Sequence, residues 1–144
     1  MRKLILTTEF KEFLTHVQKG KDGDKYVDKI MYVLDIVQRQ KMPSNTFLKP
    51  LKGRDWKGLF EIRASVGQHK FRVLCLFPDK IYGDELRLLN GFKKKDDKTI
   101  KKHKSLALKL RKQFLNNREA KEESEAPNLD NKTDAELNDS NKTD

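Results

Sequence analysis

The chain has 144 residues, which is enough for one hydrophobic core and short for two, so we expect a single domain with at most an appendage. Residues 119–144 carry nine acidic side chains and three lysines, a net charge of −6, which leaves +16 on residues 1–118 and predicts a basic domain followed by a disordered acidic tail. No apolar run approaches a secretory signal or the ~20 residues of a membrane span, and the single cysteine, Cys75, excludes an internal disulfide, so we expect a cytoplasmic protein with a packed thiol.

The first part of the chain is predicted to form a short strand, two helices and a loop. Leu4–Thr7 has the character of a strand, and Thr8 is placed to cap a helix whose apolar residues recur at spacings of three and four. A second amphipathic pattern runs over 24–37. Residues 41–57, with two prolines and a glycine, predict a loop. Two adjacent amphipathic helices need a further surface to pack on.

The second part of the chain predicts that surface. Three runs are typical of strands, Leu59–Val66, Lys70–Phe77 and Glu85–Phe92, and Gly67 with Gln68 is a candidate hairpin turn between the first two. A last helix is expected from Thr99, with apolar residues on one side and lysines and arginines on the other. Helices packed on a mainly antiparallel sheet make an α+β fold.

Alternation along the first two of these strands sorts their side chains into two faces. One face is apolar and is expected to meet the helix pair; it holds Phe60, Ile62, Ala64, Val66, Phe71, Val73, Cys75 and Phe77. Glu61, Arg63 and Arg72 then lie together on the opposite, free face, with Lys93–Lys95 at its edge. The alternative is that both arginines merely cover the outside of the sheet and that Glu61 is their ion partner.

Apart from this polar face, the sequence shows few motifs that indicate a particular chemistry. A basic domain attracts nucleic acid, an anionic membrane or an acidic protein. There is no glycine-rich phosphate loop and no CxxC pair, and the three histidines lack the spacing of metal ligands, so we expect neither a metal nor another cofactor. His69 and His103 remain candidates for proton transfer.

Four consecutive motifs carry a family resemblance. They are "LKPLKG" at Leu48–Gly53, "GLFEIR" at Gly58–Arg63, "HKFRVLCLF" at His69–Phe77 and "LLNGFKKK" at Leu88–Lys95. In order and spacing the chain resembles, over residues 4–115, the RelE/HigB superfamily of type II toxins, in particular its phage-derived HigB-like branch. The resemblance implies a RelE-like α+β fold for a toxin domain over 1–118, with residues 119–144 outside it.

The resemblance also implies an activity. Such toxins are endoribonucleases that cut mRNA, commonly on the ribosome, and so inhibit translation. A small antitoxin encoded beside the toxin silences it, and here we expect a helix-turn-helix protein. Members of the superfamily generally use no metal and bring a 2′-hydroxyl onto the adjacent phosphate, which leaves a cyclic phosphate and a free 5′-hydroxyl.

That reaction assigns roles to the polar face. Arg72 matches the strand arginine of the family's F/Y-R-V motif, and Arg63 beside it is a second donor to the charged transition state. Glu61 is expected either to accept the 2′-hydroxyl proton or to position Arg63; the neighbouring guanidiniums favour its ionised form and weaken it as a base, so Lys94 is kept as a group that shares this role.

The proton donor and the docking surface complete the predictions. Relatives carry a tyrosine or histidine as acid soon after the last strand, where this chain has Lys93–Lys95 followed by two aspartates. The basic side chains expected to bind RNA and the ribosome are Lys49, Lys52, Arg54, Lys93 and Lys95. Two alternatives stay open: a gyrase poison of the same fold, and a non-catalytic module that only binds nucleic acid.

Overall fold

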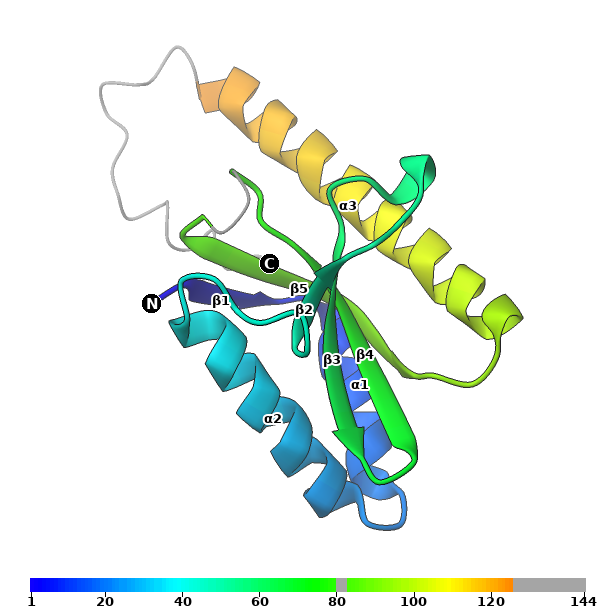
Figure 1. Ribbon diagram of the computed structural model, residues 1–144. Coiled ribbons are helices and arrows are strands. Elements are labelled where there is room, and N and C mark those ends of the chain that lie inside the picture. Colours follow the sequence, from blue (N-terminus) through cyan, green and yellow to red (C-terminus); the bar gives the residue numbers. More distant parts are fainter. Residues whose placement is uncertain (80–82, 126–144) are drawn as a thin grey trace.

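A five-stranded sheet in the order β1-β5-β4-β3-β2 lies at the centre of this computed structural model, which describes residues 1–79 and 83–125 (Figure 1). β1 is parallel to β5, and the other neighbouring strands are antiparallel. In chain order the elements are β1 (Lys3–Leu6), α1 (Thr8–Lys19), α2 (Gly23–Arg39), β2 (Leu48–Pro50), the short 3₁₀ helix η1 (Arg54–Trp56), β3 (Phe60–Val66), β4 (His69–Leu76), β5 (Glu85–Lys93) and α3 (Asp97–Glu125). The predicted α+β class is confirmed.

Two local predictions need correction. The segment 41–57 is not only a loop, because β2 adds to the edge of β3, where Pro50 can end the strand without a backbone N–H. The cap of α1 is Thr7 rather than Thr8: the Thr7 hydroxyl accepts a hydrogen bond from the backbone N–H of Phe10 at 3.1 Å. The short strand depends on its pairing with β3, which local pattern does not specify.

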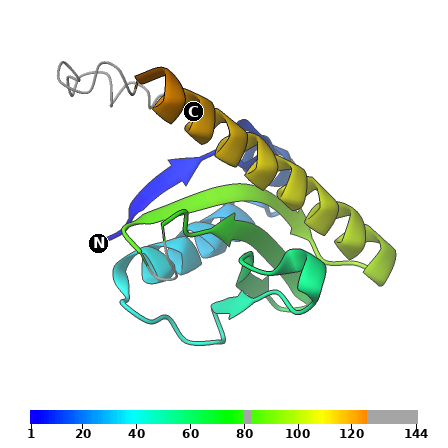
Figure 2. The same cartoon turned by 90° about the horizontal axis from the view of Figure 1, so that it is seen from above.

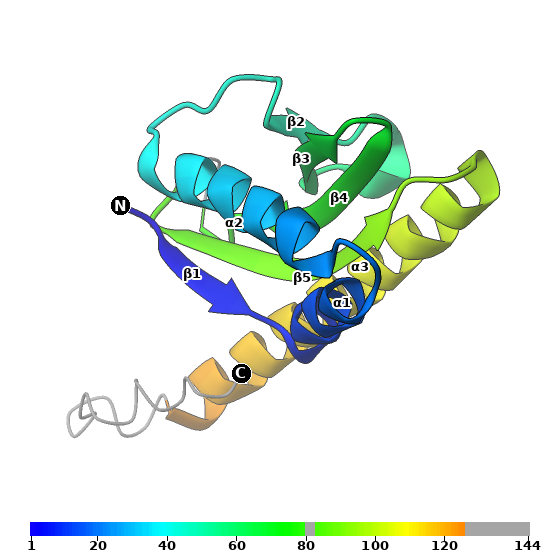
Figure 3. The same ribbon diagram turned by 90° about the horizontal axis from the view of Figure 1, so that it is seen from below.

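The helix pair covers one face of the sheet, as the alternation predicted. α1 lies against β5 and α2 against β3, and Figure 3 shows both helices on the same side of the sheet. The buried cluster between them joins Phe10, Ile30, Val33, Leu34 and Val37 to Phe60, Ile62, Ala64, Phe71, Val73 and Cys75. At one point the packing requires a glycine: a Cβ on Gly91 of β5 would collide with the ring of Phe13 of α1.

The opposite face was expected to be free, and where α3 packs on β4 and β5 this is wrong. α3 packs there, so that the sheet lies between α3 and α2 (Figure 2). The second buried cluster consists of Leu51, Leu59, Leu74, Leu76, Leu89, Phe92, Ala107 and Leu110. The sequence carried a signal for this cover, since the 71–77 run is apolar on both faces apart from one arginine, as expected of a strand buried on both sides.

α3 also extends further than the predicted domain boundary. The helix continues to Glu125, past residue 118, where the tail was placed. The predicted disordered tail otherwise falls on residues 126–144, which lie outside the described structure. Among residues 1–79 and 83–125, no helix has the length and apolar character needed to cross a membrane.

Candidate functional site

The register of the central strands aligns polar side chains in rows on the face that α3 partly covers. The first row holds Lys49, Glu61, Leu74 and Asn90, the second holds Arg63, Arg72 and Phe92, and the third holds Ser65 and Lys70. Residues directly opposite each other in a sheet share a face. The Lys94 backbone N–H donates to the Lys70 carbonyl at 2.7 Å, which extends the third row beyond the end of β5.

One carboxylate oxygen holds the centre of these rows. Glu61 Oε2 lies 2.9 Å from Nε of Arg72 and 3.2 Å from Nε of Arg63. The Arg72 side chain is only 5% exposed, whereas those of Glu61 and Arg63 are 18% and 31% exposed. Arg72 also donates to the Phe71 carbonyl at 3.1 Å. Because a guanidinium has five N–H donors, these contacts leave Arg72 able to bind another acceptor.

The electrostatics of the group favour a further anion. Burial lowers the pKa of Arg72 from its ordinary value, and the charge of Arg63 lowers it further, while Glu61 acts against both. Arginine nevertheless keeps its charge under any physiological condition. Two guanidiniums directly opposite each other therefore share one carboxylate, and an anion at this point relieves their repulsion.

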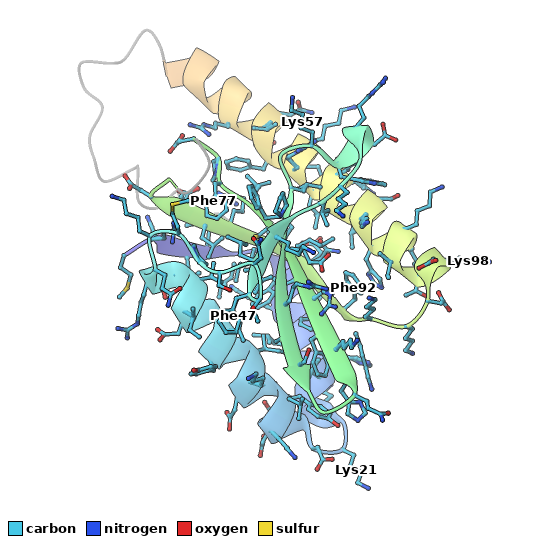
Figure 4. The ribbon with its side chains drawn as sticks, viewed as in Figure 1. Lys21, Phe47, Lys57, Phe77, Phe92 and Lys98 are labelled. Atoms are coloured by element: carbon cyan, nitrogen blue, oxygen red, sulfur yellow. The ribbon has the colours of Figure 1, made fainter. Side chains whose placement is uncertain are left out.

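A cleft of about 250 Å³ opens over the first two rows. Its lining residues come from β2 and the residues after it, β3, β4, the end of β5 and α3; they are Lys49, Pro50, Leu51, Lys52, Glu61, Arg63, Arg72, Phe92, Lys94, Ile100 and Lys104. Figure 4 shows the side chains around it, with Phe92 between the sheet and the start of α3 and Phe47 toward α2. Four lysines, two arginines and one carboxylate make the cleft cationic.

The cleft brings together most of the residues singled out in the sequence. All four predicted for catalysis line it, namely Arg72, Arg63, Glu61 and Lys94, and so do Lys49 and Lys52 of the predicted docking surface. Their roles remain predictions.

The other three docking residues do not line the cleft. Lys93 lies opposite Phe71, whose ring packs toward the helix pair, so alternation turns Lys93 to the other face of the sheet. Arg54 is exposed in η1 and Lys95 is exposed after β5. Only Lys94 of the three consecutive lysines therefore edges the surface that all three were expected to edge.

Sequence reasoning missed the wall that α3 contributes. Lys104 and Ile100 line the cleft. The helix is held there by Arg111, which donates to the Lys57 carbonyl at 2.7 Å, and by Lys104, whose Nζ lies 5.9 Å from the centroid of the Trp56 ring. The sequence showed that the last helix has a basic side, but no nearby residue pattern indicated that Lys104 lines the same cleft as Glu61.

The two candidate histidines lie outside the cleft lining. His69 pairs with Val66 and its ring lies tilted against that of Tyr26, with ring centroids 5.1 Å apart. His103 stacks flat on Phe92, with centroids 4.4 Å apart and an interplanar angle of 1°. Burial, and secondarily the charge of Lys102, lowers the pKa of His103. His103 therefore packs against Phe92, which lines the cleft, but His103 itself does not line it.

Cys75 and the potential metal ligands are the remaining groups that could take part in chemistry. Cys75 is fully buried in the cluster under the helix pair, and burial raises the pKa of its thiol, which confirms the packed thiol. In the part of the chain that the structure describes, no group of three or more histidine, cysteine or acidic side chains is placed to hold a metal ion.

The fold and the cleft define a small α+β protein with a cationic cleft built around a single carboxylate. The family model of phage-derived Gp49-like proteins (DUF891) matches residues 21–112, and the chain belongs to this family. This confirms the resemblance to the phage-derived branch of the RelE/HigB superfamily.

The chain is also similar to two solved structures. YafQ from E. coli strain BL21(DE3) is 20% identical, with a TM-score of 0.47 over 65% of this chain and 94% of YafQ. The YoeB/ParE toxin from Agrobacterium tumefaciens is 18% identical, with a TM-score of 0.47 over 65% of this chain and 99% of that toxin. No curated protein sequence matches the chain significantly.

Proposed function

We propose that this protein is the toxin of a type II toxin–antitoxin system and acts as an mRNA endoribonuclease that needs no metal. One observation carries the proposal: two arginines meet at a single carboxylate, Glu61, in an open cationic cleft. RNA cleavage by an internal 2′-hydroxyl requires a base, fixed positive donors around the phosphate, and an acid. Each has a candidate in the cleft.

The chemical step follows from these positions. The 2′-oxygen forms a bond to phosphorus as its proton passes to Glu61, and the bond from phosphorus to the 5′-oxygen breaks as that oxygen takes a proton from Lys94. Arg72 and Arg63 donate to the phosphate oxygens while negative charge accumulates on them. The products are a 2′,3′-cyclic phosphate and a 5′-hydroxyl. A lysine can serve as the acid because its ammonium form dominates at neutral pH.

The alternative role of Glu61 in this reaction is to position the two arginines, without accepting a proton. A single-turnover assay with labelled RNA separates the two. If Glu61→Gln lowers the cleavage rate by about 10²-fold or more and also removes the acidic limb of the pH–rate profile, Glu61 is the base; a slower reaction that keeps this limb would indicate positioning. Unchanged cleavage by Glu61→Gln would remove the base assignment and leave the positioning part.

The basic surface around the cleft supports ribosome-bound mRNA as the substrate. Lys49 and Lys52 line the cleft, and Arg54 and Lys95 are exposed outside its lining, so these four can contact ribosomal RNA phosphates, whereas Lys93 lies on the opposite face of the sheet. We propose that the protein acts in the cytoplasm and that a small helix-turn-helix antitoxin silences it. A neighbouring reading frame encoding such a protein would support this partner.

Induction in a bacterial host and two purified assays test the proposal together. We expect growth arrest on induction, cleavage of mRNA in a translation reaction, and no effect on gyrase supercoiling. Inhibition of supercoiling alone would identify a gyrase poison instead. RNA binding without cleavage or growth arrest would identify a non-catalytic nucleic-acid-binding module.

A further inference from the structure

A second hollow, of about 240 Å³, adjoins the cleft on the far side of the arginine pair. It shares Arg63 and Arg72 with the cleft and is otherwise lined by Lys29, Val33, Thr46, Phe47, Ser65 and Lys70. It exists because β2 is short: β2 pairs with β3 only from Phe60 to Ile62, and the last contact of the preceding segment is the hydrogen bond from the Arg63 N–H to the Phe47 carbonyl, at 2.9 Å. Beyond that point α2 borders the edge of β3 and brings Lys29 to the hollow.

The chemistry of this hollow differs from that of the cleft in one respect. Its lining contains four cationic side chains and the hydroxyls of Thr46 and Ser65, but no carboxylate. Such a set can hold a phosphate through charge and hydrogen bonds, yet it has no acidic side chain to accept a proton. The cleft, with Glu61, has both capacities. The two hollows are therefore suited to different parts of one polyanion.

We propose that this hollow, through Lys29 and Lys70, binds the phosphodiester next to the one that is cleaved, so that an RNA strand crosses the arginine row from the cleft to the edge of β3. The inference rests on the proposed function. The rows support this path, because Glu61, the arginine pair and Lys70 follow one another along the strands on one face. Rows two residues apart lie about 7 Å apart, a scale on which an extended nucleotide backbone repeats.

The first test measures binding without cleavage. The probe is a fluorescent single-stranded oligonucleotide with 2′-deoxyribose throughout, read by anisotropy at several salt concentrations. Lys29→Gln with Lys70→Gln should weaken binding about 10-fold at low salt and reduce the salt slope by about 0.7, as expected for the loss of one phosphate contact. The matched control combines Lys11→Gln on α1 with Lys3→Gln on β1, two exposed lysines away from both hollows, and should bind as the unmodified protein does.

The second test locates the phosphate along the RNA. An uncharged methylphosphonate replaces the phosphate on either side of the cleaved one in two separate substrates. One substrate should lose about 10-fold in kcat/KM with the unmodified protein, and the Lys29/Lys70 double variant should no longer distinguish that substrate from ordinary RNA. The single variant Lys70→Gln, at an exposed position, repeats the comparison should the double variant unfold.

The outcomes separate this inference from the proposed function. Normal binding and cleavage by the double variant would overturn the second phosphate site and leave the nuclease intact. Weaker binding of the deoxy probe by the double variant, in a protein that cuts no RNA, would establish the phosphate site and overturn the nuclease. If neither methylphosphonate substrate is cleaved more slowly, the neighbouring phosphate is not bound and the inference is wrong.

Discussion

Replacing Arg72 by methionine should leave the stability of the protein unchanged or raise it, and should nevertheless abolish most of its RNA cleavage. The Arg72 side chain is 5% exposed, and burial is the largest influence that lowers its pKa, so the folded protein keeps a costly desolvated cation at this position. Methionine has a similar length and no charge to desolvate. Glu61 keeps Arg63 at 3.2 Å and is itself partly exposed, so it is not left as an unpaired buried charge.

The magnitudes follow from burial. We expect Arg72→Met to change the free energy of unfolding by no more than about 1 kcal/mol, or to raise it, because the substitution removes the cost of desolvating a guanidinium while Glu61 keeps Arg63 as its partner. Glu61→Gln should instead lower it by about 2–3 kcal/mol. Removing one partner of a fully buried pair costs about 3–5 kcal/mol, and the partial exposure of Glu61 reduces that figure.

Urea denaturation of the three proteins, together with single-turnover RNA cleavage, checks this prediction. Arg72→Met should remain folded with an unchanged m-value and lose about 10²–10³-fold in cleavage rate, the loss typical of removing a donor to a charged transition state. A destabilisation of about 3 kcal/mol or more in Arg72→Met would refute the stability argument, and cleavage at the original rate would show that Arg72 takes no part in the reaction.

Three further predictions concern the α3 wall of the cleft, the packing of α1 on β5, and His103. Lys104→Gln should weaken binding of a single-stranded RNA several-fold and lower the salt slope by about 0.7, whereas Lys109→Gln on the same helix, outside the cleft lining, should not; equal effects would mean that α3 acts only through its overall charge. Gly91→Ala should cost about 1–3 kcal/mol in unfolding free energy because its methyl group would collide with the Phe13 ring, and adding Phe13→Leu should restore part of the loss; no recovery would point to backbone strain instead. Since the pKa of His103 is lower in the folded protein, the unfolded chain binds more protons below about pH 6.5, so stability should fall as the pH drops from 7 to 5. His103→Gln should flatten that fall in pH-dependent urea denaturation, and an unchanged slope would assign it to other groups.

Much of the fold was accessible from local pattern. The alternation in 60–66 and 69–76 placed Ile62 and Val73 on the same buried face, because successive side chains of a strand point to opposite sides whatever the partner. The same rule placed Glu61, Arg63 and Arg72 together, and the ion pairs at 2.9 Å and 3.2 Å agree with that placement. Helix periodicity likewise identified the pair that covers the apolar face.

Other features depend on contacts between distant segments. Periodicity showed that α3 has a basic and an apolar side but not which face of the sheet it covers, so Lys104 was missed. The three consecutive lysines at the end of β5 are chemically identical, yet the register with Phe71 and Lys70 turns Lys93 and Lys94 to opposite faces. Alternation assigns a side chain to one face of the sheet only as far as the strand continues, and the sequence pattern alone does not show where the strand ends.

The sequence by itself therefore determined the class of fold, the two faces of the central strands and the arginine–carboxylate group, because each follows from side-chain spacing within one element. The tertiary structure alone decided that α3 closes one wall of the cleft and that the short β2 leaves a second cationic hollow beside it. Both depend on how distant elements pack and where one strand stops pairing. The buried area and the hydrogen bonds of the whole chain fix those outcomes, and no single segment encodes them.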